Sequence, residues 1–251
     1  MKGKSTITTF FVGSEHESHK IKAFAVDIDG TLTENGEGMI HLPSVSKLRF
    51  LERSGYRVFF VTGRTAAEAY ILSTFCGTTK ISIGENGGVI ATGPDEFTIL
   101  GDKNSCIRGY DLLKDKISGV QIKPVFPRLS EIVLARTFDF QLGKTLLACS
   151  GLNLYLSDSN YAFHINQLGI DKAKGLGVAL ELMNIEPIEV VAIGDSQTDI
   201  PLFNMCGFSI ALGHSEHSVK TNAKYVVQGN SGIGLSNAID YASLHFLREE
   251  L

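Results

Sequence analysis

Aspartate residues stand at the ends of apolar runs in this sequence, where their carboxylates could bind a cation or attack a substrate. Asp27 and Asp29 follow the run Ala23-Phe24-Ala25-Val26, and Gly30 comes directly after them. Carboxylates at positions i and i+2 leave an extended strand on the same side, and open α/β sheets place their active sites at the carboxyl ends of parallel strands. The competing interpretation is a D-x-D-G turn without catalytic function.

A second pair of aspartates repeats this arrangement near the C-terminal end of the chain. The apolar residues 190–193 lead into Gly194 and Asp195, and Asp199 lies four residues further on, one helical turn away. Asp199 alone could be a charge that favours a helix N-terminus. Asp195 mirrors Asp27, which favours a shared site.

Two further segments could hold an anion. Thr62 and Gly63 follow the apolar residues 57–61, and a hydroxyl with free backbone N–H groups at a strand-to-helix turn suits a phosphate. Thr62 could equally be a helix N-cap. Lys172 opens an expected helix, at the unfavourable end of the helix dipole, although most such lysines are solvated.

The four aspartates would repel one another at one edge of a sheet, which raises pKa values and costs stability. A lysine and a divalent cation would offset this repulsion. Since the motifs offer carboxylate oxygens without histidine or cysteine, they favour the hard ion Mg²⁺.

The elements around these motifs alternate between strands and helices, which predicts an α/β fold with a Rossmann-like parallel sheet. The expected strands are residues 23–28, 57–61, 80–83, 189–193, 208–212 and 225–227, and the expected helices are residues 43–54, 66–75, 172–183, 200–205, 219–223 and 233–247.

The middle of the chain mixes strand and helix patterns and has prolines in its connections, which predicts an inserted α+β cap. Its expected segments are residues 87–91, 104–113, 131–136, 140–149 and 152–156. The predicted domains are therefore an N-terminal extension at 1–20, a core at 21–86 and 169–251, and a cap at 87–168.

The composition excludes several classes of protein. With 251 residues and a net charge of −4, the chain gives no electrostatic case for nucleic-acid binding. Apolar runs are only strand-length, so no membrane span is expected. The four cysteines are far apart in sequence, which argues against a disulfide framework or zinc site and favours the cytoplasm. Residues 1–20 have the pattern of a polar extension rather than a signal peptide.

The order of the motifs resembles the haloacid dehalogenase superfamily, over about residues 22–240. This resemblance implies that Asp27 is the nucleophile and a metal ligand, and that Asp29 is the general acid/base with its backbone carbonyl on the metal. It also implies that Thr62, Gly63 and Lys172 hold the phosphoryl group, while Asp195 ligates Mg²⁺ and Asp199 ligates it or orients a ligand. The expected chemistry is phosphoryl transfer through an aspartyl-phosphate.

Within this superfamily, residues 85–88 resemble the start of the cap in the Cof-type branch, and the chain is most similar to archaeal phosphoglycolate phosphatases. Arg64, Ala173 and His214 depart from those relatives, which often have asparagine, glycine and asparagine there. The implied partner is a small phosphorylated metabolite, with 2-phosphoglycolate as the expected substrate. A sugar-phosphate phosphatase and a catalytically silent binding module are the alternatives, and the sequence leaves monomer and homodimer open.

Arginine and histidine residues in or near the cap remain open in function. Arg128 and Arg136 border an apolar strand, and either could bind a substrate carboxylate or simply be solvated. His164 is expected to be structural, and His214 and His217 are expected to be solvated loop residues.

Overall fold

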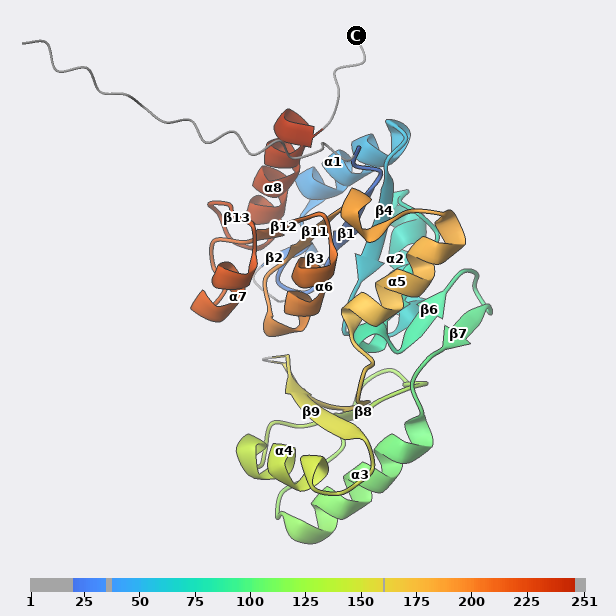
Figure 1. The fold of residues 1–251 in the computed structure, drawn as a ribbon, viewed down its shortest axis with the longest axis vertical. Coiled ribbons are helices and arrows are strands. Elements are labelled where there is room, and N and C mark those ends of the chain that lie inside the picture. Colours follow the sequence, from blue (N-terminus) through green and yellow to red (C-terminus); the bar gives the residue numbers. More distant parts are fainter. Residues whose placement is uncertain (1–19, 35–37, 160, 247–251) are drawn as a thin grey trace, which may run out of the picture.

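The computed structural model describes residues 20–34, 38–159 and 161–246, which form a larger core and a smaller cap (Figure 1). The core holds an eight-stranded sheet and the cap a three-stranded sheet. Of the extension predicted at residues 1–20, residues 1–19 lie outside the described residues. Within the described ranges, no helix is both long and apolar enough to cross a membrane.

The core sheet is parallel over most of its width. Its strands are β1 (Ala23–Val26), β4 (Arg57–Val61), β5 (Ser82–Gly84), β6 (Val89–Ala91), β7 (Phe97–Ile99), β11 (Val190–Gly194), β12 (Phe208–Ala211) and β13 (Tyr225–Val226). They lie in the order β13-β12-β11-β1-β4-β5-β6-β7. β1 and β11 are buried on both faces, and this explains their continuous apolar sequences.

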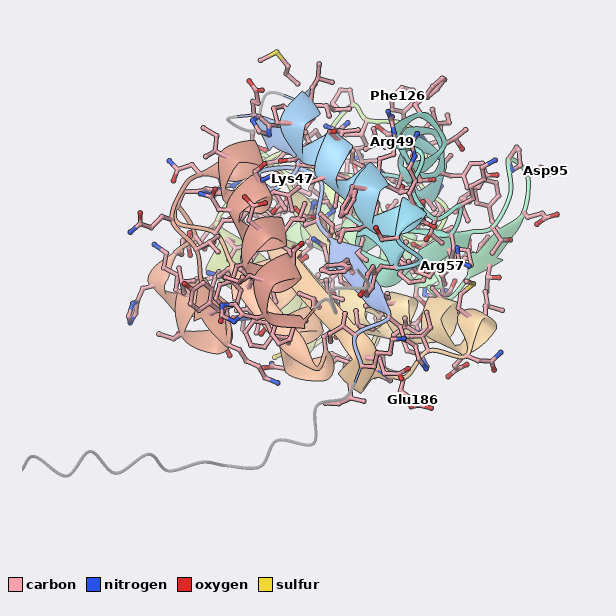
Figure 2. The ribbon with its side chains drawn as sticks, turned by 90° about the horizontal axis from the view of Figure 1, so that it is seen from above. Lys47, Arg49, Arg57, Asp95, Phe126 and Glu186 are labelled. Atoms are coloured by element: carbon pink, nitrogen blue, oxygen red, sulfur yellow. The ribbon has the colours of Figure 1, made fainter. Side chains whose placement is uncertain are left out.

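Helices cover both faces of this sheet, as the view in Figure 2 shows. Alternate residues of the central strands enter two separate apolar clusters. Phe24 and Val26 pack with α1 (Leu42–Arg53) and α8 (Ser231–Phe246), whereas Ala23 and Ala25 pack with α5 (Lys172–Met183) and α6 (Ile200–Met205). The remaining core helices are α2 (Ala66–Cys76), α7 (His217–Asn222) and the short 3₁₀ turns η1 (Glu85–Gly87), η2 (Pro187–Glu189) and η3 (Gln197–Asp199).

The cap is an antiparallel sheet with helices on one face. Its strands β8 (Ile132–Leu134), β10 (Phe163–Gln167) and β9 (Leu154–Asp158) lie in that order, and α3 (Lys103–Lys116) and α4 (Phe140–Ala148) cover the face that is turned away from the core (Figure 1). Leu154, Leu156, Phe163 and Ile165 pack beneath these helices. The intervening residues belong to the opposite, more polar face, which is turned toward the core.

The predicted parallel core with an inserted α+β cap is confirmed, but one boundary differs. β6 pairs antiparallel with β5, and β7 pairs antiparallel with β6, so both strands extend the core sheet, although residues from 87 onward were predicted to belong to the cap. Residues 89–99 therefore belong to the core sheet, and the cap elements begin with α3. The hairpin of β2 (Thr33–Glu34) and β3 (Met39–Ile40), which the sequence did not predict, lies just beyond Asp29.

Candidate active site

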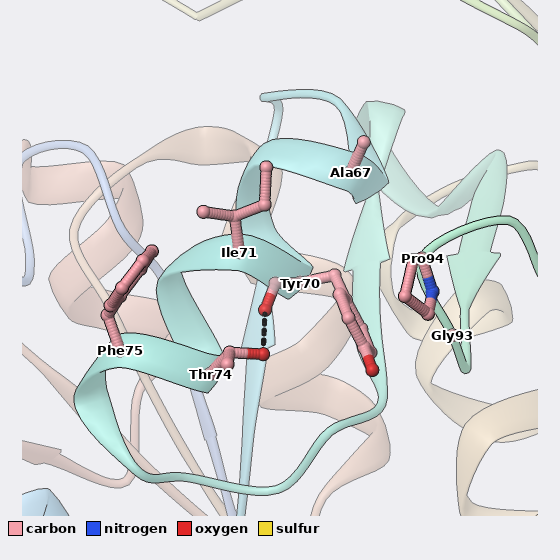
Figure 3. Close-up of a pocket in the computed structure, with 7 residues that line it drawn as sticks. All are labelled: Ala67, Tyr70, Ile71, Thr74, Phe75, Gly93 and Pro94. Atoms are coloured by element: carbon pink, nitrogen blue, oxygen red, sulfur yellow. Dashed lines mark hydrogen bonds between the residues drawn. The ribbon is translucent and has the colours of Figure 1, made fainter.

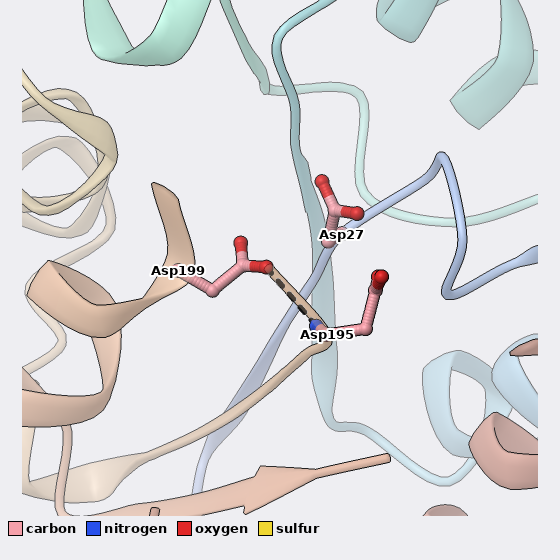
Figure 4. Close-up of side chains that lie close together, drawn as sticks. All are labelled: Asp27, Asp195 and Asp199. Atoms are coloured by element: carbon pink, nitrogen blue, oxygen red, sulfur yellow. Dashed lines mark hydrogen bonds between the residues drawn. The ribbon is translucent and has the colours of Figure 1, made fainter. Parts of the chain in front are cut away.

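Three carboxylates meet at the carboxyl edge of the core sheet (Figure 4). β1 and β11 are parallel neighbours with Val26 opposite Ile193, so Asp27 and Asp195 leave the sheet side by side. Asp199 joins them from η3, and one ligand oxygen from each of the three carboxylates lies within 4.8 Å of the other two. The sheet register therefore brings Asp27 together with Asp195 and Asp199, which lie 168 and 172 positions further along the chain.

Lys172 is the cation at the centre of this cluster. Its Nζ donates to Asp27 Oδ1 at 2.7 Å and to Asp199 Oδ1 at 2.6 Å, and only 2% of its side chain is exposed. The residue is the first of α5, where Asp171 is the N-cap and accepts from the backbone N–H of Lys174. This N-cap residue fixes where the helix begins and thereby directs the ammonium group toward Asp27.

Asp199 is held by the loop that carries Asp195. Its Oδ2 accepts from the backbone N–H groups of Asp195 and Ser196, and its Oδ1 accepts from Lys172. The close approach requires glycine at position 194, because a Cβ there would lie 2.4 Å from the Asp199 carboxyl carbon. With both oxygens engaged and the side chain fully buried, Asp199 is well placed to orient Lys172 and Asp195.

Asp195 is oriented by two further residues. Thr31 Oγ1 donates to its Oδ1 at 2.6 Å, and His214 Nε2 lies 3.2 Å from its Oδ2. Gly30, with φ of +86°, is needed here because a Cβ would lie 2.6 Å from the Asp195 carboxylate. His214 was predicted to be a solvated loop residue, and its contact with Asp195 corrects that prediction. The departure from the relatives at this position was the available signal.

The charges of this cluster are out of balance. Burial raises the pKa of Asp27 well above its usual value, the carboxylates of Asp199 and Asp195 raise it further, and Lys172 opposes the shift. Burial alone would lower the pKa of Lys172, but Asp199 and Asp27 outweigh it and the pKa lies above its usual value. The cluster thus holds one ammonium group and three carboxylates, and this imbalance of charge disfavours the ionised form of Asp27.

The predicted phosphate loop lies beside these carboxylates. Thr62 and Gly63 follow β4, the neighbour of β1, and the fully buried Thr62 accepts a hydrogen bond from the backbone N–H of Arg64 through its Oγ1 at 3.1 Å. Arg64 begins the turn into α2, whose N-cap is Thr65. The structure therefore places Thr62 and Gly63 at the same sheet edge as Asp27, as a phosphate-binding role requires.

Comparison with known protein families gives a match to the haloacid dehalogenase-like hydrolases over residues 24–115 and 140–239. The chain belongs to this family.

Individual relatives add detail to the family match. A phosphoglycolate phosphatase of Nitrosopumilus maritimus is 45% identical over 221 residues, which cover 88% of this chain and 96% of the relative. A solved structure from Thermoplasma acidophilum matches with a TM-score of 0.79 and 21% identity, over 90% of this chain and 100% of that one. A solved sugar phosphatase of haloacid dehalogenase subclass IIB matches with a TM-score of 0.74 and 18% identity, over 89% and 99%. The predictions of superfamily and of a phosphatase are confirmed, and the two structures support the fold.

In this haloacid dehalogenase-like phosphatase, the side chain of Asp29 lies outside the carboxylate cluster. Arg64 holds it through two hydrogen bonds, from Nε to Oδ2 and from Nη2 to Oδ1, both 2.7 Å long. The metal role expected for Asp29 concerns its backbone carbonyl and stays a prediction. The guanidinium of Arg64 also lies 3.4 Å from Glu68.

A second buried cluster joins the cap to the phosphate loop of the phosphatase. Arg128 donates from Nη1 to the Gly63 carbonyl at 2.6 Å and to Glu131 at 3.0 Å. Glu131, which is fully buried, also contacts His164 Nδ1 at 3.0 Å and accepts from Asn86 at 3.2 Å. His164 is buried against Glu131, and its expected structural role stays a prediction, while Arg128 ties the cap to the core. Arg136 contacts Asp158 at 2.8 Å.

A cavity of about 460 Å³ opens between cap and core beside Lys172. It receives polar and aromatic side chains from both parts of the phosphatase. Its lining includes Asn86, Phe140, Lys144, Tyr155, Asp158 and Lys172. A second cavity, on the outer side of α2, is lined mainly by apolar groups such as Ile71 and Phe75 and by none of the predicted site residues (Figure 3).

The donor set suits the magnesium ion predicted from the sequence. Asp27, Asp195 and Asp199 offer oxygen ligands only, on strand ends and a turn that hold them close together. Hard cations prefer such carboxylates. Burial raises the pKa of Asp27 most, and the negative charges of Asp199 and Asp195 that raise it further are what a divalent cation would neutralise.

Proposed function

We propose that this phosphatase is a Mg²⁺-dependent phosphomonoester hydrolase that acts on 2-phosphoglycolate through an aspartyl-phosphate. The observation that carries the proposal is the position of Asp27, which is buried at the strand end and hydrogen-bonded to Lys172 within the carboxylate cluster. The naming of a relative at 45% identity as phosphoglycolate phosphatase supports the substrate.

The first half of the reaction forms a bond between Asp27 and phosphorus. An Asp27 carboxylate oxygen attacks the phosphoryl group, the bond from phosphorus to the leaving oxygen breaks, and Asp29 gives that oxygen a proton. Lys172 and the N–H groups and hydroxyl of the Thr62–Gly63 loop hold the phosphoryl oxygens. Asp27 and Asp195 would hold Mg²⁺, which would supply charge neutralisation on the transferring group.

The second half returns Asp27 to its starting form. Asp29, now ionised, takes a proton from a water molecule as the water oxygen attacks phosphorus, and the bond between Asp27 and phosphorus breaks to release inorganic phosphate. Asp199 forms no bond to phosphorus; its oxygens accept from Lys172 and from the backbone N–H groups of Asp195 and Ser196. Its proposed role is to position Lys172 and the Asp195 loop.

We further propose that residues 100–168 form the cap that selects the leaving group. They supply one wall of the cavity beside Lys172, including Lys144, Tyr155 and Asp158. Closure of a cap over a small substrate would exclude water from the transfer step. The domain boundaries that we propose are therefore 20–99 and 169–246 for the described core.

A panel of phosphorylated metabolites, ranked by kcat/KM with Mg²⁺ present, tests the substrate. We expect 2-phosphoglycolate to rank first. A hexose phosphate that is tenfold better, a difference of about 1.4 kcal/mol in transition-state binding, would replace this proposal with the sugar-phosphate phosphatase. That alternative is favoured by the size of the 460 Å³ cavity, which is larger than glycolate needs. If the protein hydrolyses no member of the panel, the catalytically silent binding module is the remaining alternative.

A further inference from the structure

The ion pair between Arg64 and Asp29 conflicts with the role that the proposed reaction gives to Asp29. Both carboxylate oxygens of Asp29 accept from the Arg64 guanidinium at 2.7 Å. A general acid must instead direct an oxygen toward the leaving group of the substrate. The fork must therefore open during the reaction, and something must take the place of Asp29 on Arg64.

Arg64 stands close to where the leaving group has to lie. Its backbone N–H donates to Thr62 Oγ1, so it belongs to the loop proposed to hold the phosphoryl group. Its guanidinium contacts the same two oxygens that would reach the leaving oxygen. In 2-phosphoglycolate a single methylene group separates that oxygen from the substrate carboxylate, and a guanidinium fork is shaped to bind a carboxylate through two hydrogen bonds.

We propose that Arg64 binds the carboxylate of the substrate and that this exchange of partners frees Asp29 to act on the leaving oxygen. Without substrate, Arg64 holds Asp29 away from the reaction. With substrate, the carboxylate of 2-phosphoglycolate replaces Asp29 in the fork. This inference rests on the proposed function, whose site it completes with a residue that determines specificity.

The exposure of the pair suits such an exchange. The side chains of Arg64 and Asp29 are 39% and 42% exposed, so substrate can reach both. An ion pair in contact with solvent contributes little stability, and its partners can separate at low cost. A guanidinium that already has one carboxylate partner is also preformed for another of the same shape.

The arginines that the sequence offered as carboxylate readers are engaged elsewhere. Arg128 is one-tenth exposed and donates to Gly63 and Glu131. Arg136 contacts Asp158. Among the three, Arg64 alone contacts a proposed catalytic residue.

The test compares 2-phosphoglycolate with ethyl phosphate, in which a methyl group replaces the carboxylate. We expect Arg64→Gln to lower the ratio of the two kcat/KM values at least tenfold, about 1.4 kcal/mol, chiefly through a higher KM for 2-phosphoglycolate. Since Asp29 no longer has to leave an ion pair, kcat for ethyl phosphate is expected to rise. Arg64→Lys, which keeps the charge but not the fork, is expected to fall between wild type and Arg64→Gln.

Arg57→Gln is the matched control, because Arg57 is a similarly exposed arginine at the start of β4, the strand that leads to Arg64, and it pairs with Glu52. Its kcat/KM ratio is expected to equal that of the wild type. An Arg64→Gln ratio within twofold of wild type would overturn the carboxylate-binding role. A lower kcat for ethyl phosphate would overturn the claim that Arg64 holds Asp29 away from the reaction. If Arg64→Gln does not fold, the same ratio in Arg64→Lys decides, and a wild-type ratio there would overturn the role as well. A wild type without preference for 2-phosphoglycolate would instead refute the proposed substrate.

Discussion

Two buried charged clusters, one at the core sheet edge and one between core and cap, differ in their balance of charge. In the core, Lys172 pairs with Asp27 and Asp199, and the carboxylate of Asp195 lies close to theirs. At the cap junction, the Glu131 carboxylate contacts Arg128, His164 and Asn86. Both clusters are buried, so burial alone does not distinguish a reactive site from a structural one.

The pKa shifts of the two central carboxyl groups follow this balance. Burial would raise the pKa of Glu131, but His164, Arg128 and Asn86 together outweigh burial, and the pKa lies below its usual value. The pKa of Asp27 is raised. Neighbouring groups stabilise the charged form of Glu131, so this carboxylate needs no ligand. A buried carboxyl group with a raised pKa is instead a candidate for binding a ligand or a cation. The contrast assigns structure to the Glu131 cluster and chemistry to the Asp27 cluster.

Removing the nucleophile is expected to give the largest effect. Asp27→Asn keeps the shape of the side chain but cannot form an acyl phosphate, so kcat for 2-phosphoglycolate should fall by several orders of magnitude. Circular dichroism should show an unchanged fold. A variant that keeps a tenth of the wild-type kcat would show that Asp27 is not the nucleophile.

Breaking the cap cluster is expected to affect stability. Glu131→Ala leaves Arg128 and His164 buried without their carboxylate partner, and loss of one member of a buried ion pair costs about 3–5 kcal/mol. Urea unfolding measures the change. Arg57→Ala, which breaks an exposed ion pair, serves as control and should cost less than about 1 kcal/mol. Equal effects of the two variants would contradict the structural role of Glu131.

The metal requirement should respond to Asp195. We expect Asp195→Ala to raise the Mg²⁺ concentration that gives half-maximal activity, because the ion loses a ligand, and EDTA to silence the wild type. Ca²⁺ should support little turnover, since its longer and looser coordination misplaces the nucleophile. Full activity of the wild type in EDTA would remove the metal from the mechanism.

The smallest expected effect is an opposite pH dependence of stability at the two clusters. The folded pKa of Asp27 is raised above 3.8, so its contribution is present below that pH and is lost as pH rises through the folded pKa. The folded pKa of Glu131 is lowered below 4.5, so its contribution is present above that pH and is lost as pH falls through the folded pKa. In EDTA, Asp27→Asn should therefore gain stability relative to wild type as pH rises above 3.8, while Glu131→Gln should lose stability relative to wild type as pH rises toward 4.5. Parallel urea-midpoint curves for the two variants would contradict the contrast.

Local sequence patterns were sufficient to predict the elements that carry the catalytic residues. The bounds of β4, α5 and α6 agree with those predicted, because buried strands and amphipathic helices repeat with regular periods. The motif aspartates and Lys172 converge because parallel strands end at one edge. β6 and β7 were assigned to the cap because residues 85–88 resemble the start of the cap in the Cof-type branch, whereas the antiparallel pairing of β6 with β5 and of β7 with β6 depends on backbone hydrogen bonds that no local pattern shows.

Contacts between distant residues could not be predicted in this way. No spacing rule connects Arg64 with Asp29, Arg128 with Gly63 or His214 with Asp195, because each pair meets only through the packing of different loops. From the sequence, Arg128 and Arg136 were both candidates for binding the substrate carboxylate. The burial of Arg128 against the phosphate loop is seen only in the fold.

The most direct test of the central claim is to trap the phosphoryl group on the protein. The wild-type phosphatase is mixed with 2-phosphoglycolate and Mg²⁺, quenched in acid during the first turnover, digested and examined by mass spectrometry. We predict that one phosphoryl group is found on Asp27 and that Asp27→Asn yields none. Release of inorganic phosphate at the wild-type rate without a phosphorylated peptide, or with the group on another residue, would contradict this account.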